Sequence, residues 1–321
     1  MKFFFILVII PSFLLAISTQ NQVTSRYEEN RYLPWFTGPL LAGAGHTCPQ
    51  GHYVLEPYLY ILNSSSFYNS SWQATRDGTI STVSPSILAV VGITSWMDIQ
   101  LGSAMDANFK HGYQDFRISD CYVYLGFQAL EDKKGGWMPD LRILVKQDFP
   151  SGHYKNLNPD QQGVDATGSG YYKTGIAFNF QKLFYVSQSL LQARFNFNYK
   201  VSPGVYLSGF TRFAEDKKTY GKIAPQHFFT ADFAFEYLLS QNIALACDLY
   251  YEFHSFGKFK PDPDQDQGFK GSLQHQRISL APALEYNFSS DVGIIAGCWF
   301  TLAGKNAQNF STLVIALNYY H

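Results

Sequence analysis

The stretch that decides the fold is Arg277-Ile278-Ser279-Leu280-Ala281-Pro282-Ala283-Leu284-Glu285-Tyr286-Asn287-Phe288. Its odd positions carry Arg, Ser, Ala, Ala, Glu and Asn, and its even positions carry Ile, Leu, Pro, Leu, Tyr and Phe. Successive side chains of a β-strand point to opposite faces. The stretch therefore predicts a strand with one apolar face and one polar or small face.

The same alternation returns at the end of the sequence, where Leu313, Ile315, Leu317 and Tyr319 share one face. A strand that is apolar on one face, ringed by aromatic residues and continued to the last residues is typical of the closing strand of an outer-membrane barrel. We therefore take an all-β fold, a transmembrane antiparallel up-and-down β-barrel, as the working hypothesis.

The composition agrees with a barrel. Aromatic residues make up 17% of the 321 residues and charged residues only 15%, whereas soluble globular chains carry about 25% charged residues. The formal net charge of −1 gives no indication of a nucleic-acid partner, which would need a basic excess. A large soluble β protein is the alternative that composition leaves open.

The first residues predict export. Residues 1–18 have the pattern of a signal peptide, with Lys2, an apolar core over 3–15 and the small-x-small site Ala16-Ile17-Ser18. The apolar core is shorter than the roughly 20 residues that a membrane helix needs. We expect residues 19–50 to form a periplasmic or lumen-plugging segment, residues 51–321 to form the barrel, and the protein to lie in the outer membrane.

Twelve stretches keep the strand pattern, with their apolar faces almost free of charge. They are residues 53–62, 84–93, 96–109, 117–130, 140–149, 171–180, 190–200, 229–237, 243–253, 277–288, 292–302 and 310–320. Two weaker runs, 67–74 and 205–213, would make fourteen strands if they counted independently. Bacterial barrels have an even number of strands, short periplasmic turns and long external loops.

The connections fit that parity. Turns at 185–187, 240–242 and 289–291 are short and predicted to be periplasmic, and the loops over 63–79, 150–170, 201–226 and 257–273 are long and predicted to be external. Small residues on the polar face, such as Gly102 and Gly126, suit a crowded lumen better than open water. Aromatic residues at strand ends favour interfacial girdles over a soluble sandwich.

The polar faces, assigned inward, give the candidate site. The lumen-lining candidates are Glu56, Asp98, Asp120, Arg142, Lys146, Arg194, Asp232, Glu236, Asp248, Glu252, Arg277 and Glu285. They predict either a polar conduit or a filled interior of ion pairs, because twelve strands lie between filled eight-stranded barrels and open porins.

No cofactor or metal site is predicted. Four scattered cysteines lack metal-ligand spacing. The acidic stretch 262–268 departs from the calcium-binding loop pattern, because its Gly comes one place late and Leu273 stands where a bidentate Glu is needed. The Gly-rich stretch 165–170 lacks the Gly-Lys-Ser/Thr of a phosphate loop and predicts a flexible external loop.

An outer-membrane hydrolase is the enzyme alternative, because some barrels carry Ser and His near the outer rim. His254 and Ser255 lie at the outer end of a strand. Adjacent strand residues point to opposite faces, so the two are badly placed to share a proton, and only Glu252 shares the face of His254. We expect no catalytic residues and no enzymatic activity.

Two groups of motifs resemble a known family. Residues 37–42 (Thr-Gly-Pro-Leu-Leu-Ala), Gly51-His52 and Glu56-Pro57-Tyr58 resemble the opening of the MetA-pathway phenol-degradation family of outer-membrane transporters, and Ser279 to Asn287 with Gly304-Lys305-Asn306 resemble its closing portion. The resemblance implies a porin-like barrel related in manner to long-chain fatty-acid and aromatic-hydrocarbon channels. It supplies no ligand residues, and His321 stands where a terminal Phe or Trp is usual.

The expected function is uptake of small solutes, including hydrophobic or aromatic ones, through a channel of the Gram-negative outer membrane. The alternative is a structural or surface-exposed barrel whose external loops bind a partner. The expected partners are outer-membrane lipids, the barrel-assembly machinery and a small-molecule solute, with no nucleic acid.

Overall fold

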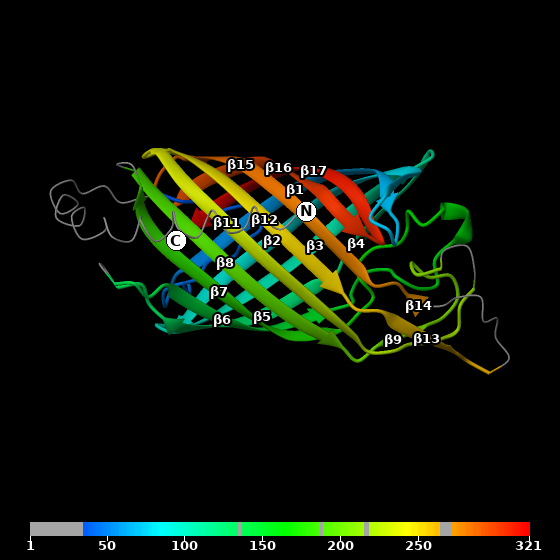
Figure 1. Cartoon of the computed structure of the whole chain (residues 1–321). Coiled ribbons are helices and arrows are strands. Elements are labelled where there is room, and N and C mark those ends of the chain that lie inside the picture. The colour runs from blue at the N-terminus through cyan, green and yellow to red at the C-terminus, as the bar shows by residue number, and fades with distance from the viewer. Residues whose placement is uncertain (1–34, 134–135, 187–188, 215–217, 264–270) are drawn as a thin grey trace, which may run out of the picture.

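The chain forms a closed antiparallel β-barrel in a computed structural model that describes residues 35–321 except 134–135, 187–188, 215–217 and 264–270. Figure 1 shows strands running obliquely around the barrel, with connections at both ends. One end, called the turn end, holds the connections 95–96, 241–242 and 288–291; the other, called the loop end, holds 150–172, 203–225 and 255–274. No helix among the described residues is long and apolar enough to cross a membrane.

Among the described residues, the barrel wall contains thirteen strands. They are β1 (Tyr53–Tyr68), β2 (Ala74–Thr94), β3 (Met97–Lys110), β4 (Tyr113–Ile118), β5 (Cys121–Leu130), β6 (Asp140–Phe149), β7 (Lys173–Val186), β8 (Ser189–Ser202), β11 (Gln226–Ser240), β12 (Ile243–His254), β15 (His275–Asn287), β16 (Val292–Lys305) and β17 (Ala307–Tyr320). The strands β4 and β5 pair with successive parts of the same neighbour, β3. They therefore occupy one position, and the barrel is twelve-stranded, as the sequence predicted.

The barrel closes because β1 pairs with β17 and β2 pairs with both β1 and β3. At the turn end Tyr53 and His321 exchange two backbone hydrogen bonds, of 2.9 and 3.0 Å. All pairings in the wall are antiparallel, so the predicted fold class is confirmed. The fourteen-strand alternative is wrong for the described residues: the run at 67–74 is the tip of the β1–β2 hairpin, and the run at 205–213 contributes only a short strand outside the wall.

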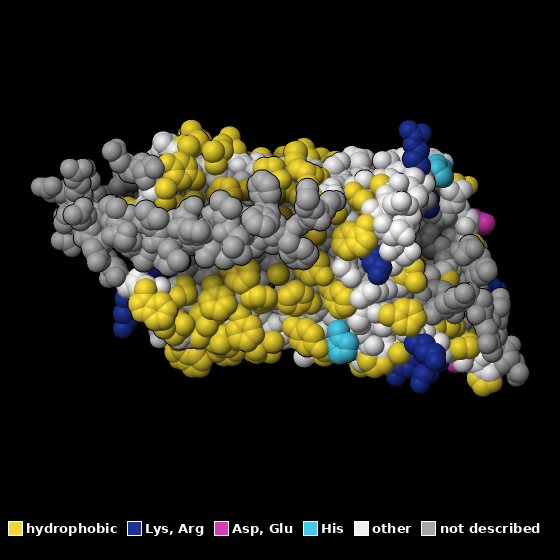
Figure 2. Space-filling model, in the orientation of Figure 1, with side chains coloured by type: hydrophobic (Ala, Val, Ile, Leu, Met, Phe, Trp, Pro, Cys, Tyr) yellow, Lys and Arg dark blue, Asp and Glu magenta, His cyan; other side chains and the backbone are white. Residues whose placement is uncertain are grey.

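The two faces of the wall follow the predicted alternation. On β15 the side chains of Ser279, Ala281 and Glu285 are fully buried, whereas Leu284 and Tyr286 are 52% and 45% exposed. Figure 2 shows hydrophobic side chains over the middle of the visible wall, with Lys and Arg toward its two ends. The outer face is thus an apolar band, as a lipid-facing surface requires.

The predicted external loop over 63–79 is wrong in its extent. Pairing between β1 and β2 continues to Tyr68 and Ala74, so only residues 69–73 form the turn. Outside the apolar band a strand needs only backbone pairing, and Ser, Thr and Asn on both faces leave no hydrophobic alternation to detect. Residues 76–78 (Arg-Asp-Gly), whose Asp-Gly pair is typical of a turn, lie within β2.

The predicted strand over 117–130 is also two strands, with a break at Ser119 and Asp120. The Asp120 carboxylate accepts hydrogen bonds from the backbone amides of Gly152 (3.2 Å) and Ser169 (2.5 Å). The loop over 150–172, with the short helix η1 (Pro159–Gln161), therefore bonds to the inner face of the barrel mouth, and strand pairing is interrupted there.

A second sheet lies at the loop end, in the order β14-β13-β10-β9. Its strands are β9 (Val205–Leu207), β10 (Gly221–Ile223), β13 (Gly257–Pro261) and β14 (Gly271–Ser272). Four side chains of this sheet are buried against two from the barrel mouth, in a cluster of Val205, Leu207, Ile223, Phe259, Tyr171 and Phe228. The long loops thereby form a packed layer against the barrel mouth.

Candidate functional site

Residues 35–50, called the luminal segment, lie inside the barrel at the turn end. Phe36 packs against Leu190, Leu238 and Ala244, next to the turns. The segment then bonds to inward side chains of β15, β12, β8, β7, β5 and β3 before it enters β1. It therefore follows the inner wall around much of the barrel and narrows the lumen.

Carboxylates of the barrel wall accept hydrogen bonds from backbone amides of the luminal segment. Glu285 accepts from the amide of Thr37 at 3.0 Å, and Asp98 accepts from the amide of Cys48 at 2.9 Å. Asp248 accepts from three successive amides, those of residues 40, 41 and 42, at 3.1, 3.2 and 3.0 Å. Buried backbone groups must find partners, and residues 38–45 of the segment carry only Gly, Pro, Leu and Ala, whose side chains cannot supply them.

Amide and guanidinium groups of the wall bind the carbonyls of the same segment. The donors in order along the segment are Arg194 to Ala42 (2.9 Å), Asn196 to Gly43 (3.1 Å), Asn179 to Ala44 (3.2 Å) and Gln128 to Gly45 (3.2 Å). At its exit the segment crosses Gly92, where an added Cβ would lie 1.9 Å from the carbonyl oxygen of Pro49. Only glycine permits that crossing.

Some of the charged wall residues form buried ion pairs. Arg142 and Asp98 pair at 2.6 Å with 4% and 0% of their side chains exposed, and an added Cβ at Gly126 would lie 2.2 Å from the Asp98 carboxylate. Arg194 and Glu236 pair at 3.4 Å. Breaking such a pair leaves an uncompensated buried charge, which is strongly destabilising.

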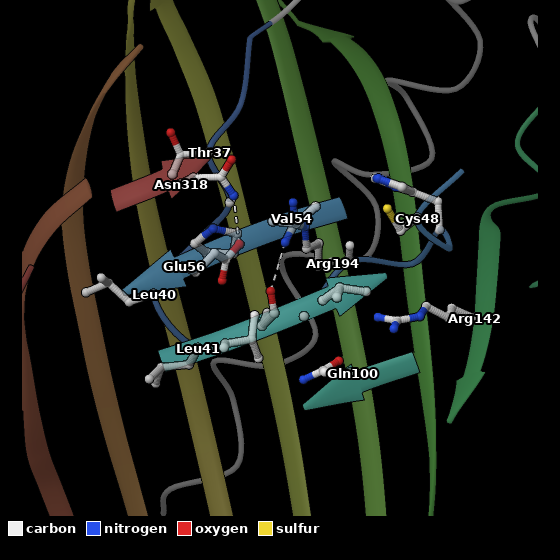
Figure 3. Close-up of a pocket in the computed structure, with 18 of the residues that line it drawn as sticks. Thr37, Leu40, Leu41, Cys48, Val54, Glu56, Gln100, Arg142, Arg194 and Asn318 are labelled. Atoms are coloured by element: carbon white, nitrogen blue, oxygen red, sulfur yellow. Dashed lines mark hydrogen bonds between the residues drawn. The ribbon is translucent and has the colours of Figure 1, made fainter. Parts of the chain in front are cut away.

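A turn-side cavity of about 620 Å³ lies between the luminal segment and the wall. Five of the twelve sequence-predicted residues line it: Glu56, Asp98, Arg142, Lys146 and Arg194. Figure 3 shows Glu56, Arg142 and Gln100 around this cavity, with Leu40 and Leu41 of the luminal segment beside it. It also reaches Ser290 in a connection at the turn end.

The other predicted residues lie elsewhere in the lumen. Asp120 lines a loop-side cavity of about 680 Å³, together with Lys173, Arg212, His254 and His275. Asp232, Glu236, Asp248 and Glu285 are at most 4% exposed, and Glu252 is 8% exposed. Arg277 pairs with Glu252 at 3.0 Å.

An ion-pair layer, defined by Asp148, Lys200, Glu252 and Arg277, separates the two cavities. On β12, Glu252 lies between Tyr250 of the turn-side cavity and His254 of the loop-side cavity. The Lys200 ammonium donates to both oxygens of Asp148, at 2.8 and 2.6 Å. A solute that moves from one cavity to the other must pass these pairs.

Aromatic lining was missed at the sequence level. The rings of Tyr58, Tyr60, Tyr250 and Trp299 line the turn-side cavity. The signal was present, because Tyr58 and Tyr60 share strand parity with Glu56. Hydrophobic pattern assigns tyrosine to either face, since its ring is apolar and its hydroxyl polar.

Two further kinds of site, a hydrolase site at His254 and Ser255 and a metal site, can be compared with the structure. Ser255 Oγ accepts from the backbone amide of His227 at 2.8 Å, while the His254 ring stacks on His275 with 4.7 Å between centroids. Within the described residues, no group of three or more His, Cys, Asp or Glu could hold a metal ion. Most of the acidic stretch 262–268 lies outside the described residues.

Searches of known protein families and of curated proteins find no match to this chain. Among solved structures it is similar to the COG4313 outer membrane channel from Pseudomonas putida F1, at 13% identity and a TM-score of 0.66 over 87% of this chain and 98% of that one. The NanC porin (9% identity, TM-score 0.40, 81% and 98% covered) and the CymD monoaromatic hydrocarbon channel (9%, 0.39, 84% and 88%) are more distant. The first likeness shows that the fold is that of an outer-membrane β-barrel.

Proposed function

We propose that this protein is a channel of the outer membrane through which small solutes pass, and that it belongs with the MetA-pathway phenol-degradation transporters that its motifs resemble. The turn end faces the periplasm and the loop end faces outward, as parity and loop length require. Membrane lipids surround the apolar band, and residues 1–18 direct export.

The observation that supports a channel is the pair of cavities along the barrel axis. The loop-side cavity is lined by residues at the mouth, such as His254 and Lys173, and the turn-side cavity reaches Ser290 at the opposite rim. Cavities of about 300–1,000 Å³ are of the size that holds small molecules. A barrel with a purely structural role would need neither space.

The luminal segment and the ion-pair layer make the passage narrow. The segment is bonded to the wall through its backbone, and the four charged groups of the layer form two ion pairs. A permeating solute therefore meets groups that already have partners at these two places rather than an open aqueous pore. This arrangement supports slow, selective passage rather than general diffusion.

Osmotic swelling of proteoliposomes tests the proposal. Vesicles that contain the folded full chain should swell in isosmotic solutions of small sugars and aromatic solutes faster than protein-free vesicles. Swelling that equals that of protein-free vesicles for every solute would contradict a channel and favour a surface-exposed barrel that binds a partner.

A further inference from the structure

The geometry points to a binding site for small aromatic carboxylates in the turn-side cavity, with the Lys146 ammonium as the group that receives the carboxylate. The inference rests on the proposed channel function for its physiological meaning, because the site would select the solutes that pass. The binding itself can be measured without any transport.

Lys146 is a basic side chain that has no carboxylate within hydrogen-bond distance among the described residues. Two other cations of the cavity are paired, since Arg142 donates to Asp98 at 2.6 Å and Arg194 lies 3.4 Å from Glu236. Lys146 makes no comparable contact; its Nζ lies 4.2 Å from the centroid of the Tyr124 ring.

The nearby carboxylates are already engaged. Asp148, two residues from Lys146 on the same face of β6, accepts two bonds from Lys200 and one of 2.8 Å from the Tyr124 hydroxyl. Glu56 accepts from the hydroxyl of Tyr58 and from Asn318, each at 2.7 Å. Burial disfavours the charged form of the Lys146 amine, and a bound anionic solute would supply the partner that favours it.

Aromatic rings extend from that ammonium along the cavity. Tyr122 and Tyr124 stack with 4.4 Å between centroids and 18° between planes, and Tyr58 and Tyr60 stack at 5.7 Å and 11°. All four line the cavity. Flat rings favour offset or edge contacts with another flat ring, so this wall matches an aryl group.

The single ammonium decides the charged group of the ligand. A lysine ammonium is a point charge that a single carboxylate can meet, whereas bidentate recognition of a phosphate uses the guanidinium fork of arginine. Both guanidinium groups of the cavity already pair with a carboxylate, Arg142 with Asp98 and Arg194 with Glu236. Charge and ring together select an aryl carboxylate over an aliphatic acid or a neutral aromatic alcohol.

Isothermal titration of the detergent-solubilised full chain tests the site with three probes: benzoate, benzyl alcohol and butyrate. Benzoate should bind at least tenfold more tightly than benzyl alcohol, which lacks the charge, and than butyrate, which lacks the ring. Lys146→Met should weaken benzoate binding at least tenfold, and Lys146→Arg should restore part of it. The matched control Lys258→Met removes an exposed lysine of the loop-end sheet and should leave binding unchanged.

Folding should survive these changes, because removing an unpaired charge from a buried site leaves no partner uncompensated; circular dichroism and heat-dependent gel mobility verify it. Equal benzoate binding by the wild type and Lys146→Met, or benzyl alcohol binding as tight as that of benzoate, would overturn the site. Benzoate binding without vesicle swelling would contradict the proposed channel function but support the binding site. Swelling without benzoate binding would refute the site and keep the channel.

Discussion

Asp248 holds the backbone of Leu40, with 3.1 Å between its Oδ2 and the Leu40 amide nitrogen, although 208 residues separate the two in sequence. Its other oxygen accepts from the amides of Leu41 and Ala42. Asp248 is fully buried, so one carboxylate of the wall fixes how deeply the luminal segment enters the barrel.

Replacing that carboxylate by an amide should loosen the luminal segment. Asp248→Asn removes the charge and replaces one accepting oxygen by an NH₂ group, which cannot accept a hydrogen bond from a backbone amide. Each hydrogen bond to a charged group contributes about 2 kcal/mol. Hydrogen–deuterium exchange over residues 37–45 should become at least tenfold faster. Leu249→Ala is the matched control, because Leu249 is the next residue of β12 and faces outward at 46% exposure. Equal exchange in the wild type and Asp248→Asn would contradict the anchoring role.

A side chain at Gly126 should disrupt the ion pair that crosses it. The Cβ of Gly126→Val would lie 2.2 Å from Asp98 Oδ1 and 2.5 Å from Arg142 Nε, so the buried pair must separate, at a cost of about 3–5 kcal/mol. Heat-dependent gel mobility should show unfolding at a clearly lower temperature than in the wild type. Leu125→Val, on the outer face of the same strand, should shift it much less, and equal shifts would refute the account.

Removing Lys200 should change the ion selectivity of the channel. Lys200→Met leaves Asp148 without its ammonium partner between the two cavities, so the layer becomes more negative and favours cations. In a KCl gradient across a planar bilayer, the reversal potential should move toward the potassium equilibrium value. Lys222→Met, an exposed change on β10, should leave it unmoved. If Lys200→Met had the same reversal potential as the wild type, the ion-pair layer would not be the barrier that sets ion selectivity.

His46 should make the luminal segment sensitive to acid. Burial disfavours its charged form, and the nearby guanidinium groups of Arg194 and Arg142 repel it, so its pKa falls to about 4. A released segment would bind the proton at about 6.5. The stabilisation of the lodged segment is therefore complete above pH 6.5 and declines as the pH falls from 6.5 to 4.

Channel conductance should accordingly rise as the pH falls from 6.5 to 4. In His46→Gln this rise should be smaller, because glutamine keeps a polar side chain that does not titrate. Wall carboxylates titrate in both proteins, so the difference between the two pH profiles isolates His46. Superimposable profiles between pH 7 and 4 would show that His46 does not govern the segment.

The barrel could be predicted from the sequence because its wall repeats one local rule. Each spanning strand needs an apolar outer face, and residues such as Leu284 and Tyr286 reveal that face by parity alone. This alternation is not required outside the membrane. The β1–β2 pairing from Asn63 onward therefore lacks it, and the sequence predicts a loop there. The break at Asp120 depends on a loop about thirty residues away, which local pattern does not contain.

The interior was harder to predict because its partners are distant in sequence. Lys146 and Asp148 are two residues apart on the same face of β6. Asp148 nevertheless pairs with Lys200 of another strand. The luminal segment carries Gly, Ala and Leu, whose backbone bonding is supplied entirely by other strands. Neither the unpaired lysine nor the path of the segment leaves a signal in the local sequence.

Cysteine modification at two adjacent residues of β1 tests the central claim, that solutes pass through this lumen. In a background without the four native cysteines, Tyr60→Cys lines the turn-side cavity and Leu59→Cys faces outward. A charged methanethiosulfonate reagent should sharply reduce single-channel current through the Tyr60→Cys protein and leave that through the Leu59→Cys protein unchanged. The absence of any current, or equal effects at both positions, would contradict the account.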